Sequence, residues 1–175
     1  MARVIGVDPG VRGALAIWDG LHLICLALPI IAVRRGGKSR SEVDATAFSH
    51  LIDEEAKLLI SAAYVEQVGA MPTDGPIQAF AFGKAYGVII GVLAAHYIPI
   101  TFVSPIRWRN RVGVLKGEKG DKAPSILRAT ECFPRHADYW SAKRGNGDAA
   151  TRSGKAEAAL IALHGWRETA MGAAA

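Results

Sequence analysis

The sequence has little cysteine and no long hydrophobic run, and both absences limit what the protein can be. Only Cys25 and Cys132 occur, without a CxxC pair or a His-rich neighbourhood, so we expect buried thiols rather than a disulfide or a zinc site. No signal peptide opens the chain, and the longest apolar run, 85–95, is shorter than the roughly 18 residues of a membrane helix. We therefore expect a cytoplasmic protein with no membrane partner.

Acidic residues are outnumbered by basic ones. The 175 residues include 21 Lys and Arg against 16 Asp and Glu, a net charge of +5 with an isoelectric point near 9.4. This excess suits an anionic partner such as nucleic acid, although many proteins without such a partner share it. Half of the residues are hydrophobic, and no repeat or linker interrupts them. We expect one domain over residues 1–168 and a frayed tail over 169–175.

Short apolar runs between turn residues predict the strands, and helical periodicity predicts the helices. The expected strands are 3–8, 12–18 and 21–28, which form an antiparallel meander, followed by 60–66 and 99–103. The expected helices begin with one that Asp44 caps, and the others cover 76–96, 124–132 and 154–166. This order indicates an α/β fold with a mixed sheet.

Two segments allow more than one interpretation. The basic, glycine-containing segment 34–40 is predicted to be a loop, either a solvated connection or a DNA contact. Helix 76–96 carries small residues four apart, although each interior glycine costs roughly 1 kcal/mol in helix propensity. This stripe predicts that another backbone packs closely, either the sheet of the same chain or a second copy of the chain. Its members are Ala79, Gly83, Gly87, Gly91 and Ala95.

Three acids are expected at one place in this fold. Asp8 and Glu66 each end a strand in the middle of the predicted sheet. Adjacent strands lie about 4.8 Å apart, so two such carboxylates can reach one cation. Glu157 shares a helical face with Leu160 and Ile161, which should face the core, so it also points inward. Oxygen ligands of this kind favour Mg²⁺ or Mn²⁺ over zinc.

Each of these acids also has a simpler interpretation. Asp8 ends a strand at a turn and would serve as a turn cap. Glu66 would form a salt bridge, and Glu157 in a first helical turn would favour the helix dipole. Their joint placement, rather than any one acid, favours a metal site.

With these residues identified, the chain resembles the RuvC-type Holliday-junction resolvases, especially the compact versions of bacteriophages, over nearly its whole length. The opening Ile5-Gly-Val-Asp8-Pro-Gly is shared with many ribonuclease H-like proteins and sugar-kinase-type ATPases, so the specific signal is the ordered set of motifs. The other motifs are Val65-Glu66-Gln-Val, Gln78-Ala-Phe-Ala-Phe-Gly83-Lys-Ala-Tyr-Gly87, Val103-Ser-Pro-Ile-Arg-Trp108 and Gly154-Lys-Ala-Glu157-Ala-Ala-Leu-Ile-Ala.

The resemblance implies a ribonuclease H-like fold, a mixed five-stranded sheet flanked by helices. It implies a homodimer that nicks opposed strands of a four-way DNA junction, and it implies no small-molecule substrate. Two Mg²⁺ or Mn²⁺ ions per active site would be held by Asp8, which bridges them, and by Glu66 and Glu157. Lys122 matches a lysine of the family that acts at the scissile phosphate.

One position departs from the family pattern. A further aspartate usually stands one turn before Glu157, and this chain has Ser153 there. A hydroxyl is a poor replacement for a carboxylate in a magnesium site. Either another acid supplies the fourth ligand, or the site is weakened. Asp148 is the first candidate and Asp138 the second, although Asp148 is equally well explained as a solvated loop acid.

Positive charge is concentrated in the segment 107–122, which predicts phosphate contacts and salt-dependent DNA binding. A second family lysine is not matched here: Trp108 stands in its place, and a neighbouring arginine would substitute. The family's wedge residue corresponds to Met71, which would equally fill a gap in the core. The expected DNA contacts are Arg107, Arg109, Arg111, Lys116, Lys119 and Met71.

Three functions are consistent with these observations. The first is a metal-dependent endonuclease that resolves four-way or other branched DNA. The second is a junction-binding protein with weakened or no cleavage, which Ser153 favours. The third is a sugar-kinase-type ATPase that shares the opening turn, but it would need a second glycine-rich phosphate loop that the sequence lacks.

Overall fold

A computed structural model describes residues 2–56, 59–69, 75–117 and 120–172, and it contains the expected mixed sheet. Five strands form this sheet in the order β3-β2-β1-β6-β7. The first three pair antiparallel, and β6 and β7 add in parallel next to β1. The strands are β1 (Val4–Asp8), β2 (Ala14–Trp18), β3 (Leu23–Ala27), β6 (Ala62–Glu66) and β7 (Ile100–Val103).

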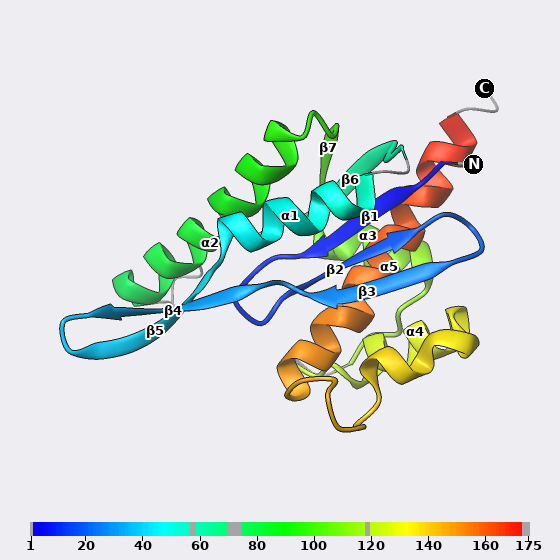
Figure 1. The fold of residues 1–175 in the computed structure, drawn as a ribbon. Coiled ribbons are helices and arrows are strands. Elements are labelled where there is room, and N and C mark those ends of the chain that lie inside the picture. The colour runs from blue at the N-terminus through cyan, green and yellow to red at the C-terminus, as the bar shows by residue number, and fades with distance from the viewer. Residues whose placement is uncertain (1, 57–58, 70–74, 118–119, 173–175) are drawn as a thin grey trace.

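Helices cover both faces of the sheet (Figure 1). On one face α1 (Ala45–Ala56) and α2 (Pro76–Ala95) pack with β1 residues Ile5 and Val7. On the other face α5 (Ala149–Gly172) lies across β1 and β2, with Val4 in that second core. The remaining helices are α3 (Pro105–Val112), α4 (Ala123–Cys132) and a 3₁₀ helix, η1 (Pro134–Trp140).

Several predicted features are confirmed. The side chain of Asp44 accepts a hydrogen bond from the Ala47 backbone N–H at 3.0 Å and so caps α1. Pro76 is the first residue of α2, where its missing N–H costs nothing. Cys25 is buried, Cys132 is half-buried, and both thiols are free.

The prediction of a loop over residues 34–40 is wrong. The chain forms a β-hairpin there, in which β4 (Ile30–Arg35) pairs antiparallel with β5 (Lys38–Val43). Gly36 and Gly37 make the two-residue turn with φ values of 56° and 77°. Both lie in the left-handed region that such hairpin turns require and that glycine adopts readily. The Gly-Gly pair was therefore a hairpin signal within a polar segment.

The helical regions extend further than predicted. The segments that form α3 and η1 were not expected to be helical. The last helix was expected over 154–166 but runs from Ala149 to Gly172, so residues 169–172 are helical rather than frayed. Residues 173–175 lie outside the described part of the chain. Gly154 in α5 is unfavourable by propensity, but a β-carbon there would lie only 3.0 Å from the Arg12 carbonyl oxygen and from an Asp8 carboxylate oxygen.

The small-residue stripe of α2 does not pack on the sheet. A β-carbon at Gly83, Gly87 or Gly91 would meet no atom within 4 Å, so the predicted intramolecular contact is wrong. Among the described helices, α2 is also the one that is long enough and apolar enough to cross a membrane, by length and composition alone. Only 17% of its most apolar 18-residue stretch is buried. This helix therefore presents an apolar surface that the described part of the chain leaves uncovered.

The contact between α5 and β1 leaves no space for a side chain at Gly6. A β-carbon there would lie 2.2 Å from the Ala162 nitrogen and 2.3 Å from the Ala158 oxygen. Both are backbone atoms of α5, which cannot move aside as a flexible side chain would. Glycine at this position therefore sets the distance between the helix and the sheet.

We predict that Gly6→Ala destabilises the protein by about 3 kcal/mol, the upper part of the usual range for overpacking in a core. Urea unfolding followed by circular dichroism measures the change. Gly69→Ala is the matched control, because a β-carbon at Gly69 meets no atom within 4 Å. Equal stability of the two variants would contradict the close contact of α5 with β1.

Candidate active site

The three predicted acids come from three elements that meet at one edge of the sheet. Asp8 ends β1 and Glu66 ends its parallel neighbour β6, where Val7 is paired with Val65. Glu157 is on the α5 face that packs on the sheet, and it is 2% exposed. A β-carbon at Gly154, one turn before Glu157, would lie 3.0 Å from an Asp8 carboxylate oxygen, and the charges of Glu157 and Glu66 both raise the pKa of Asp8.

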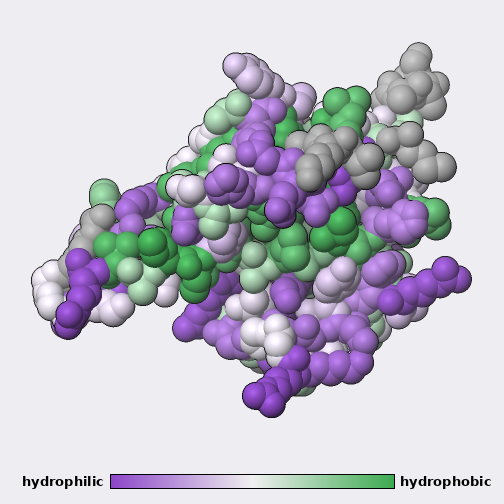
Figure 2. Space-filling view, in the orientation of Figure 1, coloured by the Kyte–Doolittle hydropathy of each residue, from purple (hydrophilic) through white to green (hydrophobic). Residues whose placement is uncertain are grey.

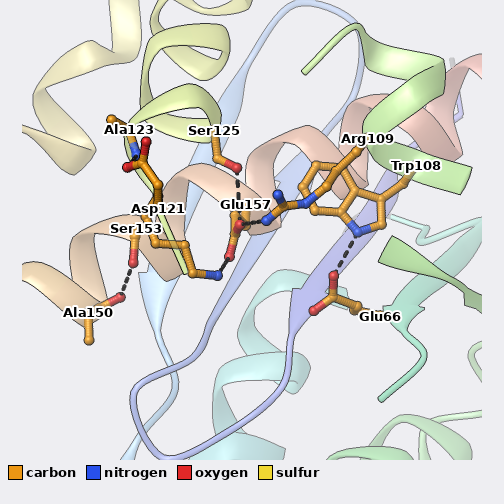
Figure 3. A network of polar contacts seen from close by, with 10 residues as sticks. Glu66, Trp108, Arg109, Asp121, Ala123, Ser125, Ala150, Ser153 and Glu157 are labelled. Atoms are coloured by element: carbon orange, nitrogen blue, oxygen red, sulfur yellow. Dashed lines mark hydrogen bonds and ion pairs between the residues drawn. The ribbon is translucent and has the colours of Figure 1, made fainter. Parts of the chain in front are cut away.

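Glu157 is surrounded by donors (Figure 3). Its Oε1 accepts hydrogen bonds from Arg109 Nη2 at 2.5 Å and from Ser125 Oγ at 3.0 Å. Its Oε2 accepts one from Lys122 Nζ at 2.5 Å. Two cations therefore balance this buried carboxylate, and Ser125, which is fully buried at the start of α4, adds a neutral donor.

Glu66 is held by a tryptophan. Trp108 Nε1 donates a hydrogen bond to Glu66 Oε1 at 2.8 Å, and the indole is fully buried (Figure 3). The local sequence explains the position, because Ser104 caps α3 immediately after β7, the strand beside β6. The Arg109 guanidinium carbon lies 5.2 Å from the Trp108 ring centroid, within range of a cation–π interaction. Two successive residues of α3 thus hold the two acids: Trp108 binds Glu66, and Arg109 binds Glu157.

Sequence reasoning missed Trp108 and Ser125 as partners of the acids. The available signal for Trp108 was the Ser-Pro cap that starts a helix beside the Glu66 strand. For Ser125 the sequence holds no comparable signal, because a serine in the first turn of a helix is common.

Asp8 has no such partners. Its carboxylate makes no hydrogen bond or ion pair with any described residue. Burial raises the pKa of Asp8 well above its usual value, and the charges of Glu157 and Glu66 raise it further, while Lys122 and Arg109 lower it. Burial also raises the pKa of Glu66, opposed by the Trp108 hydrogen bond. The charged form of Asp8 is therefore disfavoured in the site.

The donor set suits a hard cation in part. Asp8 and the second oxygen of Glu66 have no hydrogen-bond partner among the described residues, and carboxylate oxygens are preferred ligands of Mg²⁺ and Mn²⁺. Glu157 is engaged by Arg109 and Lys122, and it would have to exchange them for an ion. Accordingly, in the described part of the chain no three His, Cys, Asp or Glu side chains already form a metal-binding group.

The candidates for a fourth ligand lie elsewhere. Asp148 caps α5 by accepting a hydrogen bond from the Thr151 N–H at 2.8 Å, and its other oxygen lies 3.5 Å from Arg12 Nε. Asp138 is exposed and paired with Lys143. Ser153 is buried, and its hydroxyl donates to the Ala150 carbonyl at 2.8 Å (Figure 3). Metal binding by Asp148 stays a prediction that would require it to leave the helix cap.

The basic residues of segment 107–122 contact two separate positions on α5. Arg109 and Lys122 reach Glu157, whereas Arg107 pairs with Glu168 at 2.8 Å. Since Glu168 is 11 residues beyond Glu157 on α5, it lies about 16 Å away along the helix axis.

The other expected DNA contacts are distributed as follows. Arg111 contacts Met171, still further along α5, and Lys116 is exposed. Met71 and Lys119 lie outside the described residues. The DNA contacts expected of all these side chains stay predictions.

Comparisons with known proteins identify the fold. No protein-family model and no curated protein sequence matches the chain. The structure is similar to that of T. thermophilus RuvC in complex with a Holliday junction substrate, with 16% sequence identity, a TM-score of 0.59, and coverage of 98% of this chain and 97% of that one. A second Thermus thermophilus RuvC structure gives 15% identity, a TM-score of 0.54, and coverage of 97% and 96%. The chain therefore has the RuvC-type, ribonuclease H-like fold, as predicted.

We predict that Asp8→Asn stabilises the metal-free protein by about 1–3 kcal/mol at neutral pH, because it removes a charge that burial and the neighbouring carboxylates Glu157 and Glu66 disfavour. Because folding raises the pKa of Asp8, this residue's contribution to stability is fully present below its ordinary value of 3.8 and is lost as pH rises through the higher folded-state pKa, so the advantage of Asp8→Asn over the wild type should grow over that range. Urea unfolding in EDTA over a pH series measures both effects. Identical pH profiles for the two proteins would contradict the burial of a charged Asp8.

Proposed function

We propose that the protein is a metal-dependent DNA endonuclease that resolves four-way or other branched junctions by paired nicks. The observation that carries this proposal is the meeting of Asp8, Glu66 and Glu157 at one sheet edge in a chain with the RuvC fold. A sugar-kinase-type ATPase is not favoured, because the structural likeness is to RuvC over nearly the whole length of both chains.

In this proposal Asp8 and Glu66 provide the first oxygen ligands for two Mg²⁺ or Mn²⁺ ions. Such ions, when bound, would supply an activated water and stabilise the leaving 3′-oxygen. Glu157 would be the third ligand once Arg109 and Lys122 had left it, and a DNA phosphate is an anion that can receive them. Lys122, which is half-exposed, is the better placed of the two to bind the scissile phosphate.

A junction-binding protein without efficient cleavage is the second candidate. Ser153 stands where a carboxylate is expected, and its hydroxyl is directed to a backbone carbonyl of its own helix. Glu157 is already neutralised by two cations. Both observations favour weak metal binding, so this candidate shares the DNA partner and differs only in the chemistry.

We also propose that the protein acts as a homodimer that packs through α2. Phe80 shares a helix face with Gly87 and Gly91, and 68% of its surface is exposed. Figure 2 shows apolar side chains gathered where the base of the hairpin lies beside α2. Exposed apolar residues there include Ile30, Ile31, Ile77 and Phe80. A second copy would cover this surface, and the glycines would allow the two helices to approach closely.

The nuclease proposal predicts symmetric nicks in a labelled four-way junction with Mg²⁺, and loss of at least about 100-fold in rate for Asp8→Asn because the bridging ligand is gone. Denaturing gels under single-turnover conditions measure the rates, and binding is measured separately by fluorescence anisotropy. Junction binding without nicks in the wild type would identify the second candidate, and Ser153→Asp should then restore cleavage. No junction binding at low salt would contradict both.

The dimer proposal predicts that Phe80→Glu raises the dimer dissociation constant about 10- to 100-fold, from the loss of one buried aromatic side chain. Sedimentation equilibrium measures the constant. Leu59→Glu is the control, because Leu59 is 87% exposed and lies outside α2. A monomeric wild type, or equal effects of the two substitutions, would contradict the α2 interface.

A further inference from the structure

The hairpin β4–β5 leaves the sheet at the edge that carries the acids. Asp8 is paired with Ala14, and Ala14 is paired in turn with Ala27, the last residue of β3. The Leu28 N–H donates to the Gly13 carbonyl at 3.1 Å, so the chain is still attached to the sheet when the hairpin begins. The position of the hairpin relative to Asp8 therefore follows from strand register.

The hairpin runs alongside the first half of α2, and its turn reaches past the start of that helix (Figure 1). Each strand has six residues, which at about 3.3 Å per residue gives a reach of ~20 Å. Its base is anchored, because Glu42 of β5 forms an ion pair with Lys84 of α2 and Val43 is buried. The anchor and the paired strands give the tip a defined direction rather than the freedom of a loop.

The tip carries four cations and no acid within seven residues, 34–40. The described side chains of Arg34, Lys38 and Arg40 are exposed and form no ion pair with described residues. Figure 2 shows white and purple residues at the corresponding end of the molecule, beside the apolar surface. These three side chains have like charge and no acidic partner among the described residues, so an anionic partner explains them better than folding does.

We propose that this hairpin is a second DNA contact, which binds the phosphate backbone of a duplex arm leading away from the cleavage site. The inference rests on the proposed DNA-junction function and adds a surface that is separate from the acids and from α3. A reach of ~20 Å corresponds to roughly six base pairs at 3.4 Å each. Contacts of Arg and Lys with phosphates are independent of base sequence and release counterions.

The test compares two double variants with the same loss of charge. Arg34→Gln/Lys38→Gln removes two exposed cations of the tip. Arg135→Gln/Arg167→Gln is the control: Arg167 follows Trp166, which lies against Gly20 at the opposite edge of the sheet. Arg135 is in η1, whose Tyr139 hydroxyl contacts Leu23 at that same edge. Thermal unfolding should be nearly unchanged in both variants, since Arg34, Lys38 and Arg135 are exposed and Arg167 is only half-buried.

The readout is the slope of log K against log salt for a four-way junction, measured by anisotropy. The tip variant should lower this slope by about 1–2, close to one per lost phosphate contact, and the control should retain it. Ethylation interference should show wild-type contacts about six base pairs from the nick that the tip variant loses. If the tip variant keeps the slope and the footprint of the wild type, the hairpin does not contact DNA, and the proposed function is unaffected. A wild type that binds no junction would overturn the proposed function together with it.

Discussion

The close contact between α5 and β1 is the interaction on which the site depends. Gly6 lets the backbone of α5 lie directly against the strand, and Gly165 makes room for the Tyr64 ring, which a β-carbon there would meet at 2.2 Å. Gly154 faces the carboxylate of Asp8 in the same way, at 3.0 Å. Three glycines thus bring a helix, which carries Glu157, to the end of the strand that carries Asp8. Larger residues would separate the two acids before any chemistry began.

Charge balance is the second constraint on this edge of the sheet. Three carboxylates face two cations, Arg109 and Lys122, and both cations are directed to Glu157. Glu66 has an indole donor, and Asp8 has no partner among the described residues. An uncompensated acid destabilises the fold and is at the same time the group that a cation would stabilise most. Stability and function therefore make opposite demands on Asp8, as expected of a binding site.

The positions of the β4–β5 hairpin and of α2 also depend on this edge of the sheet. Strand register places the hairpin on the side of Asp8, and the first half of α2 runs alongside that hairpin. Arg107 and Arg111 instead lie toward the far end of α5, although they are neighbours of Arg109 in sequence. Arg109 therefore contacts Glu157 in the candidate site, whereas Arg107 and Arg111 contact the end of α5. Residues two apart point to different sides of a helix, and residues four apart point to the same side.

The sequence by itself determined the sheet, most helices and the three acids. Apolar alternation, turn residues and a capping aspartate are local signals, and an acid at a strand end is visible without the fold. Only the tertiary structure decided which donors reach those acids: Trp108, Ser125, Arg109 and Lys122 come from segments far along the chain. It also decided that the α2 stripe packs on nothing in the described chain and that 30–43 is a projecting hairpin. These features depend on long-range packing and strand register, which a local pattern of residues does not encode.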